Sequence, residues 1–139
     1  MPPQTQIPEK NKIKILIVDD DKFLVGMYSV KFESKGFDVD SANGPVEALK
    51  KLHEGKEYDI LLFDIIMPVM DGIELLRTVR KENLATKSVI IMLTNETQSS
   101  QIVQAEELHA DGYIVKASSV PSEVLEEVTK IYTDKNIKK

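Results

Sequence analysis

The chain contains no cysteine, which excludes disulfide bonds, thiol nucleophiles and thiolate metal sites. No apolar stretch approaches the roughly 20 residues of a membrane-spanning helix. The first residues, Met1–Gln6, lack a basic segment followed by an apolar one, so no secretory signal is predicted and a cytoplasmic location is expected. Lysine and arginine number 18 against 23 acidic residues, and a net charge of −5 argues against a nucleic-acid-binding surface.

What the sequence does contain fits one globular domain. Its 139 residues are 42% hydrophobic and 29% charged, which is ordinary for a folded domain with a substantial core. Residues 1–12 are polar and contain proline, so we expect a disordered N-terminal tail. The folded domain is predicted over residues 13–133, followed by a frayed tail over 134–139.

Short apolar runs alternate with segments of helical periodicity along the whole domain. Runs of this kind predict buried strands, and their alternation with helices predicts a parallel sheet covered on both faces. The expected strands are 14–18, 37–41, 60–63, 88–93 and 113–115. Five such units favour the strand order 2-1-3-4-5, so the predicted fold is a doubly wound, flavodoxin-like α/β domain with five helices.

The helices are recognised by apolar stripes and by their end signals. Asp21 is expected at the start of the first helix, Gly36 in a left-handed conformation at its end, and Asn43 as a cap before Pro45 in the second. The residues expected to face inward are Phe23, Met27 and Val30; Val46, Leu49 and Leu52; Ile73, Leu76 and Val79; Ile102, Ala105 and Leu108, within 97–109; and Val120, Val124, Val128 and Ile131.

Polar residues follow four of the predicted strands at the point where each strand ends. Asp19 and Asp20 follow the first strand, Asp64 the third, Thr94 the fourth and Lys116 the fifth. The carboxyl ends of parallel strands meet at one edge of the sheet, so these side chains should converge. Three neighbouring carboxylates call for a cation, and Mg²⁺ is the natural hard, oxygen-liganded candidate. A carboxylate beside such an ion and a lysine can act as a nucleophile toward a phosphoryl group.

Several short motifs together resemble the receiver domain of two-component response regulators, including the single-domain regulators of the chemotaxis type. They are Val18–Asp20, Asp64–Pro68 with Met70–Gly72, Leu93–Thr94 and Tyr113–Lys116. The resemblance covers roughly residues 13–133. No motif is specific alone, but their order and their places at predicted strand ends make the set very specific.

The resemblance implies a phosphoryl acceptor and a metal site. Asp64 matches the aspartate that receives a phosphoryl group from the phosphohistidine of a histidine kinase or phosphotransfer protein. Asp20 and Asp64 match direct carboxylate ligands of Mg²⁺, and Asp19 matches the acid that holds the metal through water. The backbone carbonyl of Ile66 matches the remaining protein ligand. The implied activity is that of a signalling switch, which catalyses only its own phosphorylation and dephosphorylation.

The same resemblance implies how the signal leaves the site. Thr94 and Lys116 match the switch hydroxyl and the lysine that contact the phosphoryl oxygens. Tyr113 matches the aromatic residue that turns inward when the hydroxyl moves. The output surface would be the face made by the fourth helix, fifth strand and fifth helix. The expected partners are a kinase or phosphotransfer protein and an unidentified output protein, with neither nucleic acid nor membrane. The expected state is a monomer or a phosphorylation-dependent dimer.

Four residues depart from the usual pattern of the family. Val69 and His109 stand where glycine is common, Asn95 where alanine or glycine is common, and Ala117 where proline is usual. We expect a left-handed conformation at His109, because histidine is among the non-glycine residues that tolerate it. We also expect a trans peptide between Lys116 and Ala117, because a cis bond before a non-proline residue costs about 2.5–4 kcal/mol.

Three alternatives stay open at the level of the sequence. The first is a Mg²⁺-dependent phosphatase or phosphotransferase with an aspartate nucleophile, although Ile66 stands where such enzymes usually carry the general acid. The second is a receiver fold used as a constitutive, unphosphorylated scaffold. The third is that the chain is a fragment of a longer regulator.

Overall fold

The computed structural model describes residues 12–94, 99–116 and 120–137. Its strands are β1 (Lys14–Val18), β2 (Asp38–Ala42), β3 (Ile60–Asp64), β4 (Val89–Thr94) and β5 (Gly112–Val115). Its helices are α1 (Lys22–Ser34), α2 (Pro45–His53), α3 (Gly72–Lys81), α4 (Ser99–Glu107) and α5 (Pro121–Ile137). The N-terminal tail predicted over residues 1–12 lies almost wholly outside these described residues.

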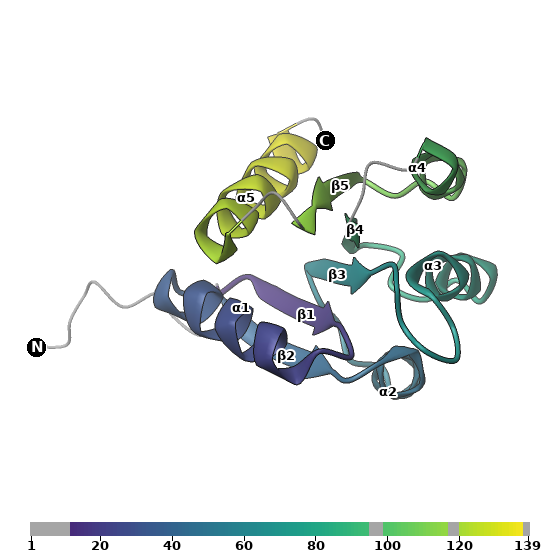
Figure 1. Ribbon diagram of the computed structural model, residues 1–139, viewed down its shortest axis with the longest axis horizontal. Helices are drawn as coiled ribbons and strands as arrows, with labels where there is room; N and C mark the ends of the chain where they lie inside the picture. Colours follow the sequence, from purple (N-terminus) through teal and green to yellow (C-terminus); the bar gives the residue numbers. More distant parts are fainter. Residues whose placement is uncertain (1–11, 95–98, 117–119, 138–139) are drawn as a thin grey trace, which may run out of the picture.

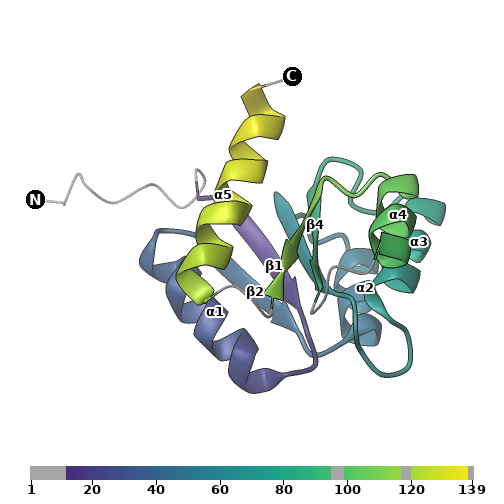
Figure 2. The same cartoon turned by 45° about the horizontal axis from the view of Figure 1, so that its top comes forward.

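The five strands form one parallel sheet in the order β2-β1-β3-β4-β5, as the alternation of strands and helices predicts. Helices α1 and α5 cover one face of the sheet, and α2, α3 and α4 cover the other (Figures 1 and 2). The fold is therefore the predicted doubly wound, flavodoxin-like arrangement, with its switch point between β1 and β3.

The central strands are buried on both faces and divide their side chains between two cores. In β1, Ile15 and Ile17 pack toward α1 and α5, whereas Leu16 and Val18 pack toward the other three helices. Strands β3 and β4 follow the same alternation, because successive side chains of a strand point to opposite faces. All five residues of β3 are buried, which explains why the sequence shows a continuous apolar run there.

The prediction for the inner face of α1 was wrong. Phe23 and Val30 leave 75% and 69% of their surface exposed, whereas Val25, Tyr28 and Phe32 are buried. The helix carries apolar residues around most of its circumference, so periodicity alone had no basis for choosing the face that packs. An apolar stripe therefore remains uncovered on the outside of α1.

Smaller corrections concern the starts of two other helices. Val46 in α2 and Val120 just before α5 are 69% and 57% exposed rather than inward. The N-cap of α2 is Gly44, and Asn43 instead uses its backbone N–H to donate to the Glu47 carboxylate. Seven residues that were predicted to face inward are buried: Leu52, Ile73, Leu76, Val79, Ala105, Val124 and Val128.

Helix α5 continues past residue 133, the predicted end of the folded domain. It runs to Ile137, and the ammonium group of Lys135 lies 3.3 Å from a carboxylate oxygen of Asp111 at the start of β5. A last-turn lysine also complements the helix dipole. This ion pair places the last turn of the helix against the body of the domain.

Several predicted end signals are confirmed. The Asp21 side chain accepts a hydrogen bond from the Leu24 N–H at the start of α1, and Gly36 has a φ of 90° after its end. His109 adopts the left-handed conformation expected of it, with a φ of 64°. The peptide between Lys116 and Ala117 lies outside the described residues.

A strained turn follows β3. Val69 has a φ of 74°, and the Met70 N–H donates to the Pro68 carbonyl at 2.8 Å, which closes a three-residue turn. Such a γ-turn with a positive φ is rare and strained, and valine tolerates it poorly because its side chain branches at Cβ. The Val69 side chain is 92% exposed, so no packing compensates for the strain.

Replacing Val69 by glycine should increase stability. Glycine relieves the left-handed strain but loses more conformational entropy on folding, so we expect a net gain of about 1 kcal/mol in the free energy of unfolding. Denaturant unfolding measures it. His109→Gly is the matched control, for which a smaller gain is expected because histidine tolerates this conformation better. A loss of stability in Val69→Gly would contradict this account of the turn.

Candidate functional site

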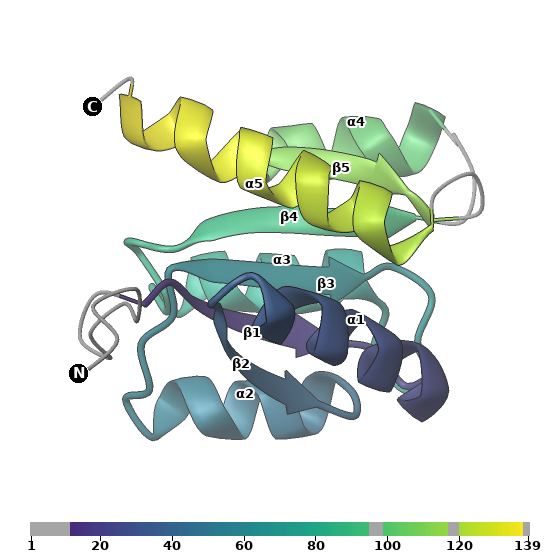
Figure 3. The same ribbon diagram turned by 90° about the vertical axis from the view of Figure 1, so that its left-hand side faces the viewer.

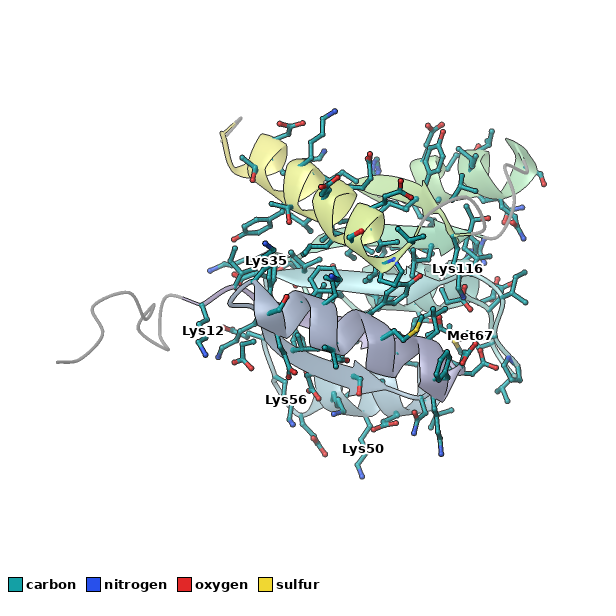
Figure 4. The ribbon with its side chains drawn as sticks, turned by 60° about the vertical axis from the view of Figure 1, so that its left-hand side comes forward. Lys12, Lys35, Lys50, Lys56, Met67 and Lys116 are labelled. Carbon is teal, nitrogen blue, oxygen red and sulfur yellow. The ribbon has the colours of Figure 1, made fainter. Side chains whose placement is uncertain are left out.

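Strands β1, β3, β4 and β5 end at the same edge of the sheet (Figure 3). Lys116 follows β5 at this edge, at the same end of the molecule as Met67, whereas Lys12 and Lys56 lie at the opposite end (Figure 4). The polar residues that follow these strands in the sequence are therefore brought to one place, as the topology predicts.

Asp19, Asp20 and Asp64 form a cluster at this edge. One carboxylate oxygen from each lies within 4.8 Å of those of the other two. Asp19 and Asp64 are buried, with 0% and 2% of their surface exposed, whereas Asp20 is open to solvent. Like charges held this closely repel one another, so the cluster requires a positive charge nearby.

Lys116 supplies part of that positive charge. Its ammonium group donates to Asp19 Oδ2 at 3.0 Å and lies 3.2 Å from Asp64 Oδ1. The second contact is an ion pair, and among the described residues the buried Asp64 Oδ1 has no hydrogen bond of regular geometry. A buried carboxylate oxygen in this state is costly, and its open lone pairs are available to a cation or an electrophile.

The pKa values reflect this crowding. Burial, followed by the negative charge of Asp19, raises the pKa of Asp64 to about 6, because Lys116 offsets these effects only in part. Burial alone would lower the pKa of Lys116, but its contacts with Asp19 and Asp64 outweigh that effect and raise the pKa above the usual value. Lys116 therefore remains charged, and Asp64 is mostly ionised at neutral pH.

Two side chains of the predicted set lie on neighbouring strands. Thr94 ends β4 and is buried, with 2% of its surface exposed, opposite Val115 in the register with β5. Tyr113 is 44% exposed on β5, so it points outward in this structure. Ile66 is 56% exposed in the loop after β3. It offers its backbone carbonyl but no acidic or basic side chain.

Backbone hydrogen bonds hold the first acidic pair in place. The Asp19 N–H donates to the Ala42 carbonyl at 3.2 Å, which fixes Asp19 against β2. The Asp21 N–H donates to Asp19 Oδ1 at 3.0 Å, so this oxygen points toward the backbone of Asp21. Oδ2 of Asp19 accepts from Lys116, and both oxygens of this carboxylate therefore have a partner.

Gly72 positions Asp64 from the other side, a role that the sequence analysis did not assign. Its N–H donates to the Ile65 carbonyl at 2.8 Å at the start of α3. A Cβ atom on Gly72 would lie 2.2 Å from the carbonyl oxygen of Asp64, so any side chain here would displace the end of β3. The Asp71-Gly72 pair in the sequence motif was the signal from which this role could have been predicted. Asp71 caps α3 by accepting a hydrogen bond from the Glu74 N–H.

Tyr28 is a second residue that the sequence analysis did not connect with the site. It is 1% exposed on the inner face of α1. Burial raises the pKa of its hydroxyl, which is also influenced by the charges of Lys116, Asp19 and Asp64. The phenol therefore forms part of the electrostatic surroundings of the acidic cluster.

The donor set fits a hard divalent cation. Three carboxylates contribute oxygens within 4.8 Å of one another, and one of them, Asp64, also carries the buried Oδ1 that pairs with Lys116. Mg²⁺ is usually held by one or two carboxylates, with water completing the coordination. Asp20, which is open to solvent, leaves room for that water.

Comparison with known proteins identifies the family. The sequence model of the response regulator receiver domain matches residues 15–129. The chain belongs to the response regulator receiver family. The receiver is a signalling switch of two-component systems that is phosphorylated on an aspartate.

Similar proteins of known sequence are transcriptional regulators. The chain is 40% identical over 103 residues to the CpxR homolog of Haemophilus influenzae, covering 74% of this chain and 43% of that protein. It is 38% identical over 111 residues to PhoP, the alkaline phosphatase synthesis regulator of Bacillus subtilis, covering 80% and 45%. The chain thus spans less than half the length of these curated relatives.

Solved structures agree with this family assignment. The chemotaxis response regulator CheY4 of Vibrio cholerae is 30% identical with a TM-score of 0.78, and the match covers 86% of this chain and 98% of that one. A CheY-like receiver domain from Methanospirillum hungatei is 30% identical with a TM-score of 0.81, covering 92% and 99%. Within the described part of this receiver, no helix is both long and apolar enough to cross a membrane.

The raised pKa of Asp64 predicts how stability depends on pH without metal. The folded protein takes up a proton near pH 6 and the unfolded chain only near its ordinary value of 3.8, so ionised Asp64 destabilises the fold above about pH 6. In chelator, Asp64→Asn should therefore raise the free energy of unfolding by about 2 to 3 kcal/mol at neutral pH. The gain should shrink as the pH falls from about 6 to 4.

Denaturant unfolding of the two proteins across this pH range measures the effect. Asp71→Asn is the control, because Asp71 caps α3 through the Glu74 N–H and is exposed to solvent. A gain for Asp64→Asn that stays constant from about pH 7 to 4 would contradict the assigned origin.

Proposed function

We propose that Asp64 accepts a phosphoryl group from a phosphohistidine of a histidine kinase or phosphotransfer protein, and that the phosphorylated domain signals through the α4–β5–α5 face. One observation carries the proposal. Asp64 Oδ1 is buried 3.2 Å from the Lys116 ammonium group and beside the carboxylates of Asp19 and Asp20, and no regular hydrogen bond from the described part of the chain reaches it. This is an arrangement for a nucleophilic carboxylate rather than for a structural one.

The transfer itself needs little more than correct positioning. A carboxylate oxygen of Asp64 forms a bond to phosphorus while the phosphorus–nitrogen bond of the donor breaks, and the imidazole leaves with the electron pair. The ammonium group of Lys116 is placed to donate to a phosphoryl oxygen as charge shifts onto it. Thr94 offers a hydroxyl at the end of the neighbouring strand. The product is an aspartyl phosphate.

Mg²⁺ would be held by Asp20 and Asp64, by Asp19 through water, and by the backbone carbonyl of Ile66. When bound, the ion supplies positive charge that offsets repulsion between the carboxylates and an incoming phosphoryl group. The closeness of the three carboxylates supports this assignment.

The environment of Asp64 favours a switch over a hydrolytic enzyme. Aspartate-based phosphatases usually place a general acid two residues after the nucleophile, and here that residue is Ile66. Its side chain is 56% exposed and cannot carry a proton. The output would pass through Thr94 to Tyr113 and then to α4, where Val103 is 48% exposed and offers an apolar contact to an output protein.

Phosphorylation of Asp64 is directly testable. After incubation of the full chain with Mg²⁺ and acetyl phosphate, intact mass should show one phosphoryl adduct, and Asp64→Asn should show none. Chelator should abolish the adduct in the wild type, because the three carboxylates then repel the donor. Asp59→Asn, which changes an aspartate at the other end of β3, is the matched control and should be phosphorylated normally. An adduct that survives in Asp64→Asn would overturn the assignment.

The uncovered stripe on α1 supports a docking site for the phosphodonor protein. Phe23, Gly26, Met27 and Val30 line a shallow apolar groove together with Pro121 of α5. Lys22 and Lys31 flank the apolar residues, so the groove fits an apolar helix face with acidic neighbours. Helix α1 begins directly after Asp19–Asp21, so the groove starts close in sequence to two residues of the acidic cluster.

Phe23→Ser should separate protein donors from small donors. We expect phosphotransfer from a cognate phosphorylated kinase to slow at least about tenfold, because a central apolar anchor is lost. Phosphorylation by acetyl phosphate should be unchanged, since Phe23 is 75% exposed and only the groove is altered. Val103→Ser, at an apolar residue on α4 that is 48% exposed, is the control. Equal slowing with both donors would rule out a docking role for the groove.

A further inference from the structure

Arg80, near the end of α3, holds the C-terminal end of α4. Its Nε donates to the Leu108 carbonyl at 3.0 Å and its Nη2 to the His109 carbonyl at 2.7 Å. The last carbonyls of a helix have no partner within the helix, and hydrogen bonds from a charged donor are stronger than neutral ones. The two helices lie side by side on the same face of the sheet (Figure 2).

The same end of α4 is closed by its own backbone. The His109 N–H donates to the Glu106 carbonyl at 3.0 Å and the Ala110 N–H to the Ala105 carbonyl at 2.9 Å. With the positive φ of His109, this pattern is a Schellman motif. The end is thus a defined structure, and its Leu108 and His109 carbonyls face the guanidinium group of Arg80.

The residue that follows this motif is fixed to the sheet. The Asp111 N–H donates to the Ile90 carbonyl at 2.7 Å, and the Ile90 N–H donates back to Asp111 Oδ2 at 2.8 Å. Lys135 of α5 adds an ion pair to the other carboxylate oxygen of Asp111. The segment that leaves α4 is therefore tied to α3, to β4 and to α5.

The rest of α4 packs lightly. Among its residues 100–107, only Ala105 is fully buried, whereas Ile102 is half-buried and Val103 is 48% exposed. Its N-terminal end lies toward the sheet edge where β4 ends at Thr94 (Figure 3). A helix held firmly at one end and lightly elsewhere moves most easily by pivoting about the held end.

We propose that Arg80 anchors the C-terminal end of α4, so that signalling moves the helix as a lever about this end. The pivot rests on the proposed function, in which phosphorylation of Asp64 acts on α4 through Thr94. The anchor does not depend on phosphorylation, because all of its contacts are present in the structure described. Arg80 is a positioning residue of the output face and does not contact the acidic cluster.

The chain offers a matched control for Arg80. Arg77 lies one turn earlier on α3, and its side chain pairs with Glu74 of the same helix. Arg80→Gln and Arg77→Gln therefore remove the same charge from the same helix. Only the first removes donors from the end of α4.

Hydrogen exchange of the unphosphorylated full chain tests the anchor. The amides of Leu108, His109 and Ala110 should exchange at least about tenfold faster in Arg80→Gln than in Arg77→Gln, normalised to the amide of Ile17 in β1. Equal normalised rates in the two variants would overturn the anchor, whatever the phosphorylation state does.

The pivot is tested by NMR on adding Mg²⁺ and beryllofluoride, a mimic of the acyl phosphate. In the wild type and in Arg77→Gln, shifts should be large at residues 100–103 and small at 108–110, and the Arg80 Nε–H signal should stay in place. In Arg80→Gln, the shifts should extend to 108–110. A merely structural role for Arg80 would not change this distribution.

Two other results would count against the pivot. Uniform shifts along α4 in the wild type, or loss of the Arg80 Nε–H signal, would show that the helix moves as a unit or leaves its anchor. If beryllofluoride produced no shift even at the acidic cluster, the proposed function and the pivot would both fail. Hydrogen exchange would then still decide the anchor.

Discussion

The structure of the site depends on one electrostatic problem, which is to hold the carboxylates of Asp19, Asp20 and Asp64 together at the end of a buried sheet. A single lysine, Lys116, contacts the two buried carboxylates and keeps its own charge by doing so. One positive charge does not balance three negative ones, and the pKa of Asp64 is raised first by burial and then by the negative charge of Asp19. This excess of negative charge favours the binding of a divalent cation, which would offset the repulsion between the carboxylates and an incoming phosphoryl group.

The fold is arranged so that this strained edge does not unfold the domain. Strands β1, β3 and β4 bury continuous apolar runs on both faces of the sheet. The free energy gained by burying these two cores offsets the cost of the charged edge. Gly72 brings α3 against the backbone of Asp64, and the positive φ of Val69 accommodates the sharp turn between them. Strain therefore accumulates in the loop after β3, next to the functional carboxylate.

The same sheet separates the surfaces that serve different purposes. The apolar stripe of α1 begins beside the acidic cluster on one face, and α4 lies on the other face. Arg80 and Asp111 hold the end of α4 that is far from the cluster, whereas the near end follows Thr94. In the proposed function, a donor and an output protein would therefore use different surfaces, and the sheet edge would lie between them.

The sequence by itself determined the strands, their order and which polar residues share one edge of the sheet. Asp19, Asp20, Asp64 and Lys116 each follow an apolar run, and parallel topology leaves the ends of such runs only one edge to share. Tertiary structure decided the rest. Apolar residues occur around most of the circumference of α1. Only packing against the sheet could therefore decide that Tyr28 is buried and Phe23 is exposed. The role of Gly72 is visible only when the carbonyl of Asp64 lies beside it. The contacts of Arg80 at the end of α4 are with Leu108 and His109, which are 28 and 29 positions away in the sequence. Local periodicity carries no information about such distant contacts, because they exist only once the helices have packed.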